Sequence, residues 1–190
     1  MEPETLVMGA IYVVGQWVYI SAYDVLAHLI ATTRLTPSRF FPALAASGFK
    51  FDRLVATRLK RELGASGADT LANLWSRVDT TSHPPGPVMA MVGEIVVHSG
   101  DIGRPLGITH AYDADALTSA ADFYKSSNLL IGAKTRIAGL TLRATDVDWS
   151  TGSGPEVSGP LIALVLAMCG RSATSGDLSG EGAATLASRL

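Results

Sequence analysis

The chain has 190 residues, of which 47% are hydrophobic, and it carries a formal net charge of −2 at pH 7. This length can fold into one full core, or into one core with a small appendage. The nearly balanced charge argues against a nucleic-acid partner, which normally requires a strongly basic surface. The single cysteine, Cys169, excludes an internal disulfide and suits a cytoplasmic location.

The first apolar stretch, residues 7–20, is predicted to be neither a signal peptide nor a membrane span. It has no basic start and no small-residue cleavage site, and Glu2 and Glu4 precede it. It is also shorter than the ~20 apolar residues that a membrane-spanning helix needs. We therefore expect a core segment or an imperfect chain start here, and no contact with a membrane.

Helical periodicity dominates the chain up to about Ser127. Apolar residues at helical spacing, with polar residues on the opposite face, predict helices at 21–34, 49–63, 68–78, 87–101 and 113–127. Ser21 and Asp24 form a capping-box-like start for the first of these helices, and Gly64 ends the second. Several amphipathic helices in succession predict a helical bundle.

Two short segments interrupt this series of helices. Thr36 followed by Pro37 opens a short helix, which Pro42 should kink or end. The sequence SHPPGP at 82–87 predicts a rigid loop, because its three prolines fix φ and lack N–H donors. The one dense charge cluster has mixed sign and is interpreted as the solvated end of a helix. It comprises Arg58, Lys60, Arg61 and Glu62.

The pattern changes in the last third of the chain. Residues 138–149 alternate between apolar and polar side chains, which predicts a half-exposed strand. The turn-rich segment that follows leaves room for a short second strand around 156–158. Apolar segments then predict two more helices, at 159–170 and 181–190.

These elements predict a mainly α fold, α+β overall, with a helical bundle in residues 1–130 and a small strand-plus-helix region in residues 131–190. The glycine-rich segments 64–70 and 152–159 are interpreted as turns. The first lacks the Lys-Ser/Thr of a phosphate-binding P-loop, and the second has the wrong glycine spacing for a dinucleotide-binding loop.

A polar stripe runs along the predicted helix at 87–101. Glu94, His98 and Asp101 follow one another at spacings of four and three, so they lie on one face of a helix that is otherwise apolar nearly all round. Such a helix is buried on most sides, and an ionised carboxylate there is costly unless it is paired or bound to a cation. The stripe is therefore a candidate site.

A second apolar helix, at 21–34, also carries an imidazole. His28 stands among aliphatic residues, with Asp24 one turn before it. Two histidines and one glutamate form the ligand set of open catalytic zinc sites, and the same set can hold ferrous iron. Alternatively, both histidines are hydrogen-bonded core residues and Glu94 with His98 is a simple ion pair. Periodicity does not show whether the two helices face each other, so both interpretations stay open.

Three segments carry a resemblance to a known family. They read AYDVLAHL at 22–29, GEIVVHSGDIGRPLG at 93–107 and GLTLRATDVDWSTGSGPEVSGPLIALVLAMCGR at 139–171. Together they resemble the actinobacterial maleylpyruvate isomerase family of mycothiol-dependent enzymes, whose core is similar to the DinB-like metal-binding four-helix bundle. The likeness covers roughly residues 17–190. It departs from the family in a shortened first helix and in Gly103, where many relatives carry arginine.

The resemblance implies a divalent metal, with zinc expected first, held by His28, Glu94 and His98. It also implies mycothiol as a second cofactor, a small-molecule electrophile as substrate, and activity as an isomerase or thiol transferase. Arg104 and Arg143 are expected to bind an anionic group of the substrate or thiol. Asp101 and Asp24 are expected to orient the two histidines, although Asp24 also suits the first turn of a helix on electrostatic grounds.

Two alternative functions remain open. One is a non-catalytic metal-binding or small-ligand-binding bundle. The other is a metal-dependent hydrolase. The motif argues against a hydrolase, because the motif lacks the general base found inside HExxH. Cys169 lies in an apolar helix and is expected to be a buried neutral thiol rather than a nucleophile. Asp146, Asp148 and Trp149 are interpreted as turn and packing residues, and a homodimer is left open.

Overall fold

The structure is a computed structural model that describes residues 11–13, 16–18, 22–129 and 131–190. The described residues are mainly helical, with a small three-stranded sheet, as the predicted fold class requires. The expected N-cap Ser21 lies outside the described residues. Among the described helices, none has the length and apolar character needed to cross a membrane.

The described chain divides into two compact units, which are considered separately below. The first contains residues 22–91, and the second contains residues 92–190 together with the short strands at 11–13 and 16–18. This division lies within one continuous helix, between residues 91 and 92. The boundary expected from the sequence lies at residue 130, where the helical periodicity ends. That sequence-based boundary stays a prediction.

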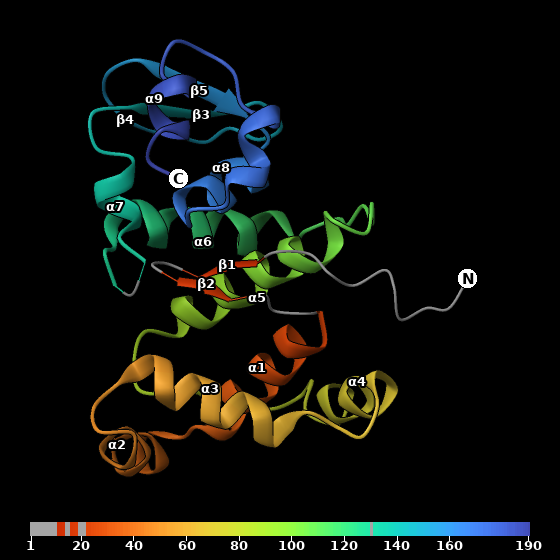
Figure 1. Cartoon of the computed structure of the whole chain (residues 1–190). Coiled ribbons are helices and arrows are strands. Elements are labelled where there is room, and N and C mark those ends of the chain that lie inside the picture. Colours follow the sequence, from red (N-terminus) through yellow and green to blue (C-terminus); the bar gives the residue numbers. More distant parts are fainter. Residues whose placement is uncertain (1–10, 14–15, 19–21, 130) are drawn as a thin grey trace. The chain divides into compact units, whose positions relative to one another are not determined.

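The first unit consists of four helices (Figure 1). They are α1 (Ala22–Arg34), α2 (Pro37–Ala46), α3 (Phe51–Glu62) and α4 (Gly67–Trp75). Helix α1 packs against α3 and α4 and buries Val25 and Ile30 in this contact region, while α3 contributes Leu54. The Arg34 Nε atom lies 3.0 Å from Glu62 Oε2, which ties the end of α1 to the end of α3. Lys60 and Arg61 are exposed at this end of α3, as the predicted solvated helix end requires, whereas Glu62 is partly buried against Arg34.

Helix α2 begins at Pro37 as predicted but continues past Pro42 to Ala46. Of the two expected effects of Pro42, a kink or an end, the end is therefore wrong, and the kink stays a prediction. A proline deprives the carbonyl four residues earlier, here that of Ser38, of its intrahelical donor. Both Ser38 and Pro42 are exposed, so water can take the place of the missing N–H and the interruption costs little.

The second unit contains the remaining elements. Its helices are α5 (Val88–Gly103, here from Val92), α6 (Ala114–Ser126), α7 (Ala133–Arg136), α8 (Leu161–Met168), the 3-10 helix η2 (Ser172–Asp177) and α9 (Ala183–Ala187). Its strands are β1 (Ile11–Val13), β2 (Gln16–Val18), β3 (Thr141–Ala144), β4 (Ser150–Gly152) and β5 (Glu156–Gly159).

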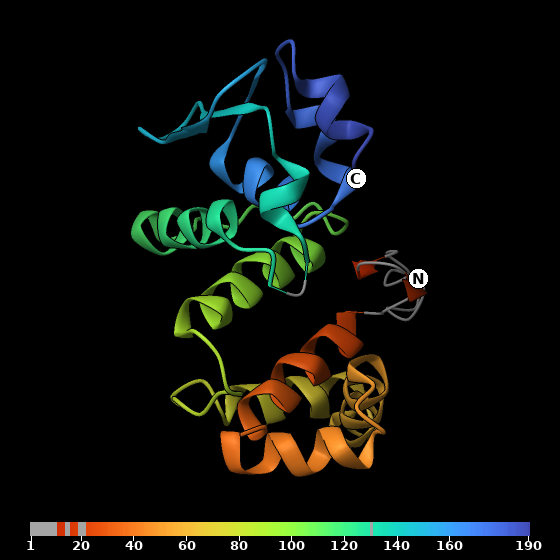
Figure 2. The same ribbon diagram turned by 90° about the vertical axis from the view of Figure 1, so that its left-hand side faces the viewer.

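The three-stranded sheet has the order β4-β3-β5, with β3 antiparallel to β4 and parallel to β5. Leu142 at its centre lies opposite Thr151 on one side and Val157 on the other. Helix α8 lies between this sheet and α6 (Figure 2). All but one of the residues of α8 are buried, which explains why this segment is apolar on every face. Strands β1 and β2 form a separate antiparallel pair.

Strand β4 and the short helices α7 and η2 were not expected from the sequence. Strand β4 is Ser-Thr-Gly at the edge of the sheet, with no apolar side chain to produce an alternating pattern. Trp149, just before it, is buried and donates from Nε1 to Asp122 Oδ1 at 3.0 Å. Asp146 accepts from the Leu161 amide at 2.8 Å at the start of α8. Both residues therefore have the packing and turn roles predicted for them.

Glycines allow α5 to pack closely against its neighbours in the second unit. A Cβ atom on Gly93 would lie 2.4 Å from Tyr124 Oη of α6, and one on Gly100 would lie 3.0 Å from the Leu166 methyl groups of α8. These two glycines lie seven residues apart on α5, so they line one side of it. The helix that carries the polar stripe is thereby held close to the core.

We predict that Gly93→Ala destabilises the second unit by about 1–3 kcal/mol, because the added methyl group overlaps the Tyr124 ring and neither α5 nor buried Tyr124 can move away freely. Urea unfolding followed by circular dichroism measures the change. Gly176→Ala is the control, since an added Cβ there meets no atom within 4 Å. Equal unfolding midpoints for the two variants would contradict close packing at Gly93.

Candidate metal centre

Helix α5 brings Glu94, His98 and Asp101 into one hydrogen-bonded chain. His98 is buried, and its Nε2 atom lies 3.1 Å from Glu94 Oε2. Its Nδ1 atom lies 3.0 Å from Asp101 Oδ2. The Glu94 side chain is 32% exposed, whereas the Asp101 side chain is 4% exposed. The stripe therefore runs from the partly exposed carboxylate of Glu94 to the buried carboxylate of Asp101.

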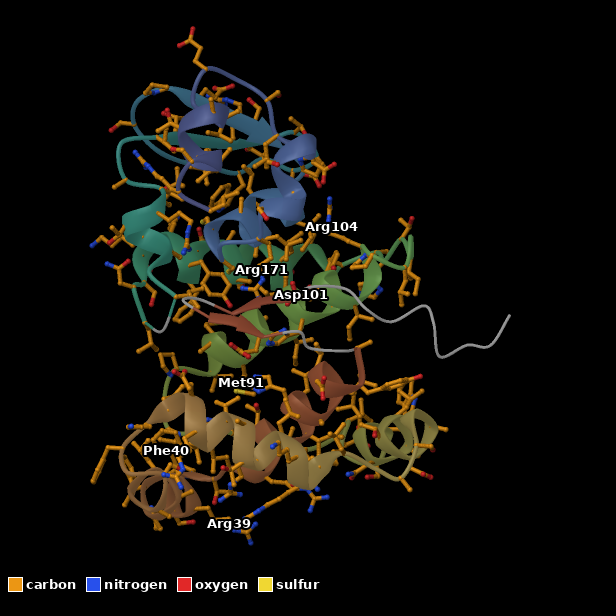
Figure 3. All side chains as sticks on the ribbon, in the orientation of Figure 1. Arg39, Phe40, Met91, Asp101, Arg104 and Arg171 are labelled. Carbon is orange, nitrogen blue, oxygen red and sulfur yellow. The ribbon has the colours of Figure 1, made fainter. Side chains whose placement is uncertain are left out.

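The closed end of this stripe is anchored by Arg171, which follows α8 (Figure 3). The Arg171 Nε atom donates to Asp101 Oδ1 at 3.1 Å, and Nη2 donates to Asp101 Oδ2 at 2.9 Å. The remaining terminal nitrogen donates to the Cys169 carbonyl at 2.8 Å. A buried cation is thus paired through a planar, two-bond contact with the carboxylate that holds His98.

The protonation of this chain follows from its hydrogen bonds. Burial alone would lower the pKa of His98, but hydrogen bonds to Asp101 and Glu94 and their negative charges raise it to about 9. Burial alone would raise the pKa of Asp101, but hydrogen bonds from His98 and Arg171 hold it below its usual value. Without a bound cation, His98 is therefore an imidazolium at neutral pH, and a cation that binds Nε2 must displace a proton.

His28 and Asp24 belong to α1 in the first unit. His28 is partly buried on this helix, and its backbone carbonyl accepts a bond from the Thr32 hydroxyl at 2.9 Å. Asp24 lies in the first turn of α1 and is also partly buried. This is the position at which a carboxylate interacts favourably with the helix dipole.

Within the second unit, Glu94 and His98 offer one carboxylate oxygen and one imidazole nitrogen to a cation. Ligand atoms at ~2.1 Å from a tetrahedral zinc ion are about 3.4 Å apart, and the His98–Glu94 distance of 3.1 Å already approaches this value. An imidazole and a carboxylate are ligand types that suit zinc or ferrous iron, and His28 is the further ligand that the resemblance implies. The group is compatible with metal binding.

The two arginines expected to bind an anion both form ion pairs within the second unit. Arg104, just after α5, pairs with Asp177 at the end of η2. Arg143 on β3 donates from Nε to Glu156 Oε2 at 2.8 Å. A substrate carboxylate at either arginine would have to compete with a carboxylate of the chain itself. Their anion-binding role stays a prediction.

Cys169 and Tyr124 form a buried polar pair beside α5. Burial raises the pKa of the Cys169 thiol to about 12, so the thiol is neutral and poorly nucleophilic, as the sequence predicted. Burial also raises the pKa of Tyr124, whose hydroxyl hydrogen-bonds with Cys169. Sequence reasoning assigned no role to Tyr124 or to Arg171. The only local signal for Arg171 is its place after Gly170, at the end of an apolar helix.

No family model, curated protein or solved structure matches the chain. The resemblance to the maleylpyruvate isomerase family therefore rests on the quoted sequence motifs. The candidate centre itself stands on the geometry of Glu94, His98 and Asp101 within the second unit.

We predict that the metal-free protein loses stability as the pH rises from about 6.5 toward 8.5. The pKa of His98 is raised in the folded state, so its contribution is complete below the unfolded value near 6.5 and is lost on the way to 9. The total loss is on the order of 1–3 kcal/mol. Cys169 adds a loss of the same sign only above about pH 8.5, where the unfolded thiol ionises.

Urea midpoints measured in the presence of a chelator at several pH values test this dependence. His98→Asn should flatten the curve between pH 6.5 and 8.5, whereas His110→Asn, which changes an exposed histidine, should leave it as in the wild type. A wild-type slope retained in His98→Asn would rule out His98 as its source.

Proposed function

We propose that the chain binds a divalent cation, zinc in the first instance, through His28, Glu94 and His98, and that this cation activates a low-molecular-weight thiol. In the family that the sequence resembles, the thiol is mycothiol. The observation that supports the proposal is the pairing of His98 Nε2 with Glu94 Oε2 at 3.1 Å, with Asp101 on the other nitrogen of the same ring. His28 is the third ligand that the family resemblance implies. A divalent cation at such a site lowers the pKa of a bound thiol, so that a thiolate forms near neutral pH.

The residues around the ligands suit this role. Asp101 accepts from His98 Nδ1, which fixes the tautomer with Nε2 directed to the ligand position. Glu94 is partly exposed, so a small thiol has access to its side of the site. Cys169 is buried and neutral, so the reacting thiol must come from outside the chain.

The reaction that we propose begins with addition of the thiolate to an electrophilic alkene carbon of a small molecule. The new C–S bond uses the sulfur electron pair, and the alkene π pair moves onto the conjugated acceptor group. After rotation about the resulting single bond, return of that pair expels the thiolate and gives the isomer. Retention of the C–S bond, with protonation of the carbon, gives thiol transfer instead. Arg104 or Arg143 would bind a substrate carboxylate by exchange with its present partner.

A structural role of the same residues is the second candidate. His98 as imidazolium is already paired with two carboxylates, and this arrangement is self-sufficient without a cation. A hydrolase is a weaker third candidate because α5 carries no general base within the motif. We further propose a cytoplasmic protein, monomeric or homodimeric, without nucleic-acid or membrane partners.

We predict that the wild-type chain binds one zinc ion and that His28→Ala weakens binding at least tenfold, because one of the three proposed protein ligands is lost. At 100 times the dissociation constant, zinc should stabilise the wild type by about 2.7 kcal/mol. Calorimetric titration and urea unfolding measure the two quantities. His110→Ala serves as the control, being a histidine outside the ligand group. Equal zinc affinity in His28→Ala and the wild type would favour the structural alternative.

We also predict that mycothiol added to the cobalt-substituted protein produces a thiolate-to-cobalt charge-transfer band in the near ultraviolet. The band should be absent from His98→Asn, which removes a ligand. The same protein should consume or isomerise an unsaturated dicarboxylate only when mycothiol is present. A cobalt spectrum that is indifferent to thiol would argue against thiol activation while leaving metal binding intact.

A further inference from the structure

We propose that Arg171 is a positioning residue of the metal centre, which acts through Asp101 to fix His98 as a ligand. This inference rests on the proposed metal site and concerns how that site is held. Arg171 itself contacts Asp101 and the Cys169 carbonyl, so it acts through another residue and not on a substrate.

The Asp101 carboxylate is shared between two partners. Its Oδ1 atom accepts one bond from Arg171, and its Oδ2 atom accepts another while lying 3.0 Å from His98 Nδ1. A carboxylate held only by His98 could rotate about its Cβ–Cγ bond and present either oxygen. The two-bond contact with the planar guanidinium fixes the carboxylate plane, so Oδ2 stays on His98.

The end of α8 explains how Arg171 reaches a residue 70 positions earlier in the chain. Gly170 has φ +84°, its amide donates to the Ala167 carbonyl, and the Arg171 amide donates to the Leu166 carbonyl. This pair of bonds is a Schellman ending, which turns the chain sharply after the helix. Gly170 therefore directs Arg171 back toward α5, into a position where 10% of its side chain is exposed.

The position of the His98 ring supports the same assignment. Asp101 contacts its Nδ1 atom and Glu94 contacts its Nε2 atom, so a fixed Asp101 carboxylate also fixes the direction in which Nε2 points. Arg171 thus provides the orientation that His98 requires.

A matched control is present at the same helix end. Arg136 donates from Nη1 to the Met168 carbonyl at 2.5 Å, as Arg171 donates to the Cys169 carbonyl. Arg136 donates to the backbone carbonyls of Ile131, Met168 and Arg189, whereas Arg171 donates to the Asp101 carboxylate. Arg136→Met therefore removes a comparable cap from the end of α8 and leaves the Asp101–His98 contact in place.

The experiment measures zinc affinity by chelator competition, and the ligand-field spectrum of the cobalt form, in Arg171→Met, Arg171→Lys and Arg136→Met. Both Arg171 variants should bind zinc about tenfold or more weakly and show an altered cobalt spectrum, because lysine keeps the charge but not the planar two-bond contact. Arg136→Met should lower the unfolding midpoint with zinc affinity unchanged. In an Asp101→Asn background, Arg171→Met should cause no further loss of affinity.

The outcomes separate this inference from the metal site itself. Zinc affinity of both Arg171 variants equal to that of the wild type overturns the positioning role and leaves the site standing. Equal losses of zinc affinity in Arg171→Met and Arg136→Met would mean that Arg171 acts only as a cap of α8, and they also overturn the positioning role. A wild-type chain that binds neither zinc nor cobalt overturns the site and the positioning role together. Arg171→Lys keeps the comparison available if Arg171→Met does not fold.

Discussion

The Asp101 carboxylate, closed off from solvent and divided between Arg171 and His98, is the constraint on which the candidate centre depends. A buried ion pair adds little net stability, because the cost of removing two charges from water offsets most of their attraction. Its effect is geometric. It links the end of α8 to the last turns of α5 and determines which nitrogen of His98 faces Glu94.

The packing of the second unit makes this constraint possible. Helix α8 is buried on nearly every face between the sheet and α6, so its C-terminal end is held in place, and Gly93 and Gly100 let α5 approach α6 and α8. Close-packed helices transmit position well because a core at native density has little free space. The polar stripe of α5 is therefore carried by a rigid element, whereas a loop would hold the same residues less precisely.

Local spacing predicted part of this arrangement and could not predict the rest. Glu94, His98 and Asp101 were identified together because residues three and four apart share a helix face whatever the remaining chain does. The role of Arg171 could not be predicted, because its contact with Asp101 joins residues far apart in the chain. Nothing in the sequence around Arg171 indicates that contact. A role for His28 beside Glu94 could likewise not be derived from periodicity, and it is expected only through the family resemblance.

The errors in secondary structure have the same origin. Strand β4 has no apolar residue and is held by backbone pairing with β3, which leaves no trace in hydropathy. Helix α2 tolerates Pro42 because this part of the helix is exposed to solvent. That exposure follows from the fold and cannot be deduced from the local sequence. The long apolar segments were predicted well because burial alone determines their composition. The helical class was thus accessible from sequence, but the details that depend on tertiary contacts were not.

The position of Cys169 has a practical consequence for any study of thiol chemistry on this protein. It is the only sulfhydryl in the chain, and it is enclosed beside Tyr124 within the core. An alkylating or chromogenic reagent can therefore reach it only through transient opening of the second unit. In the native protein the Cys169 thiol therefore does not react with such reagents. The rate at which Cys169 becomes labelled measures how often the core of the second unit opens.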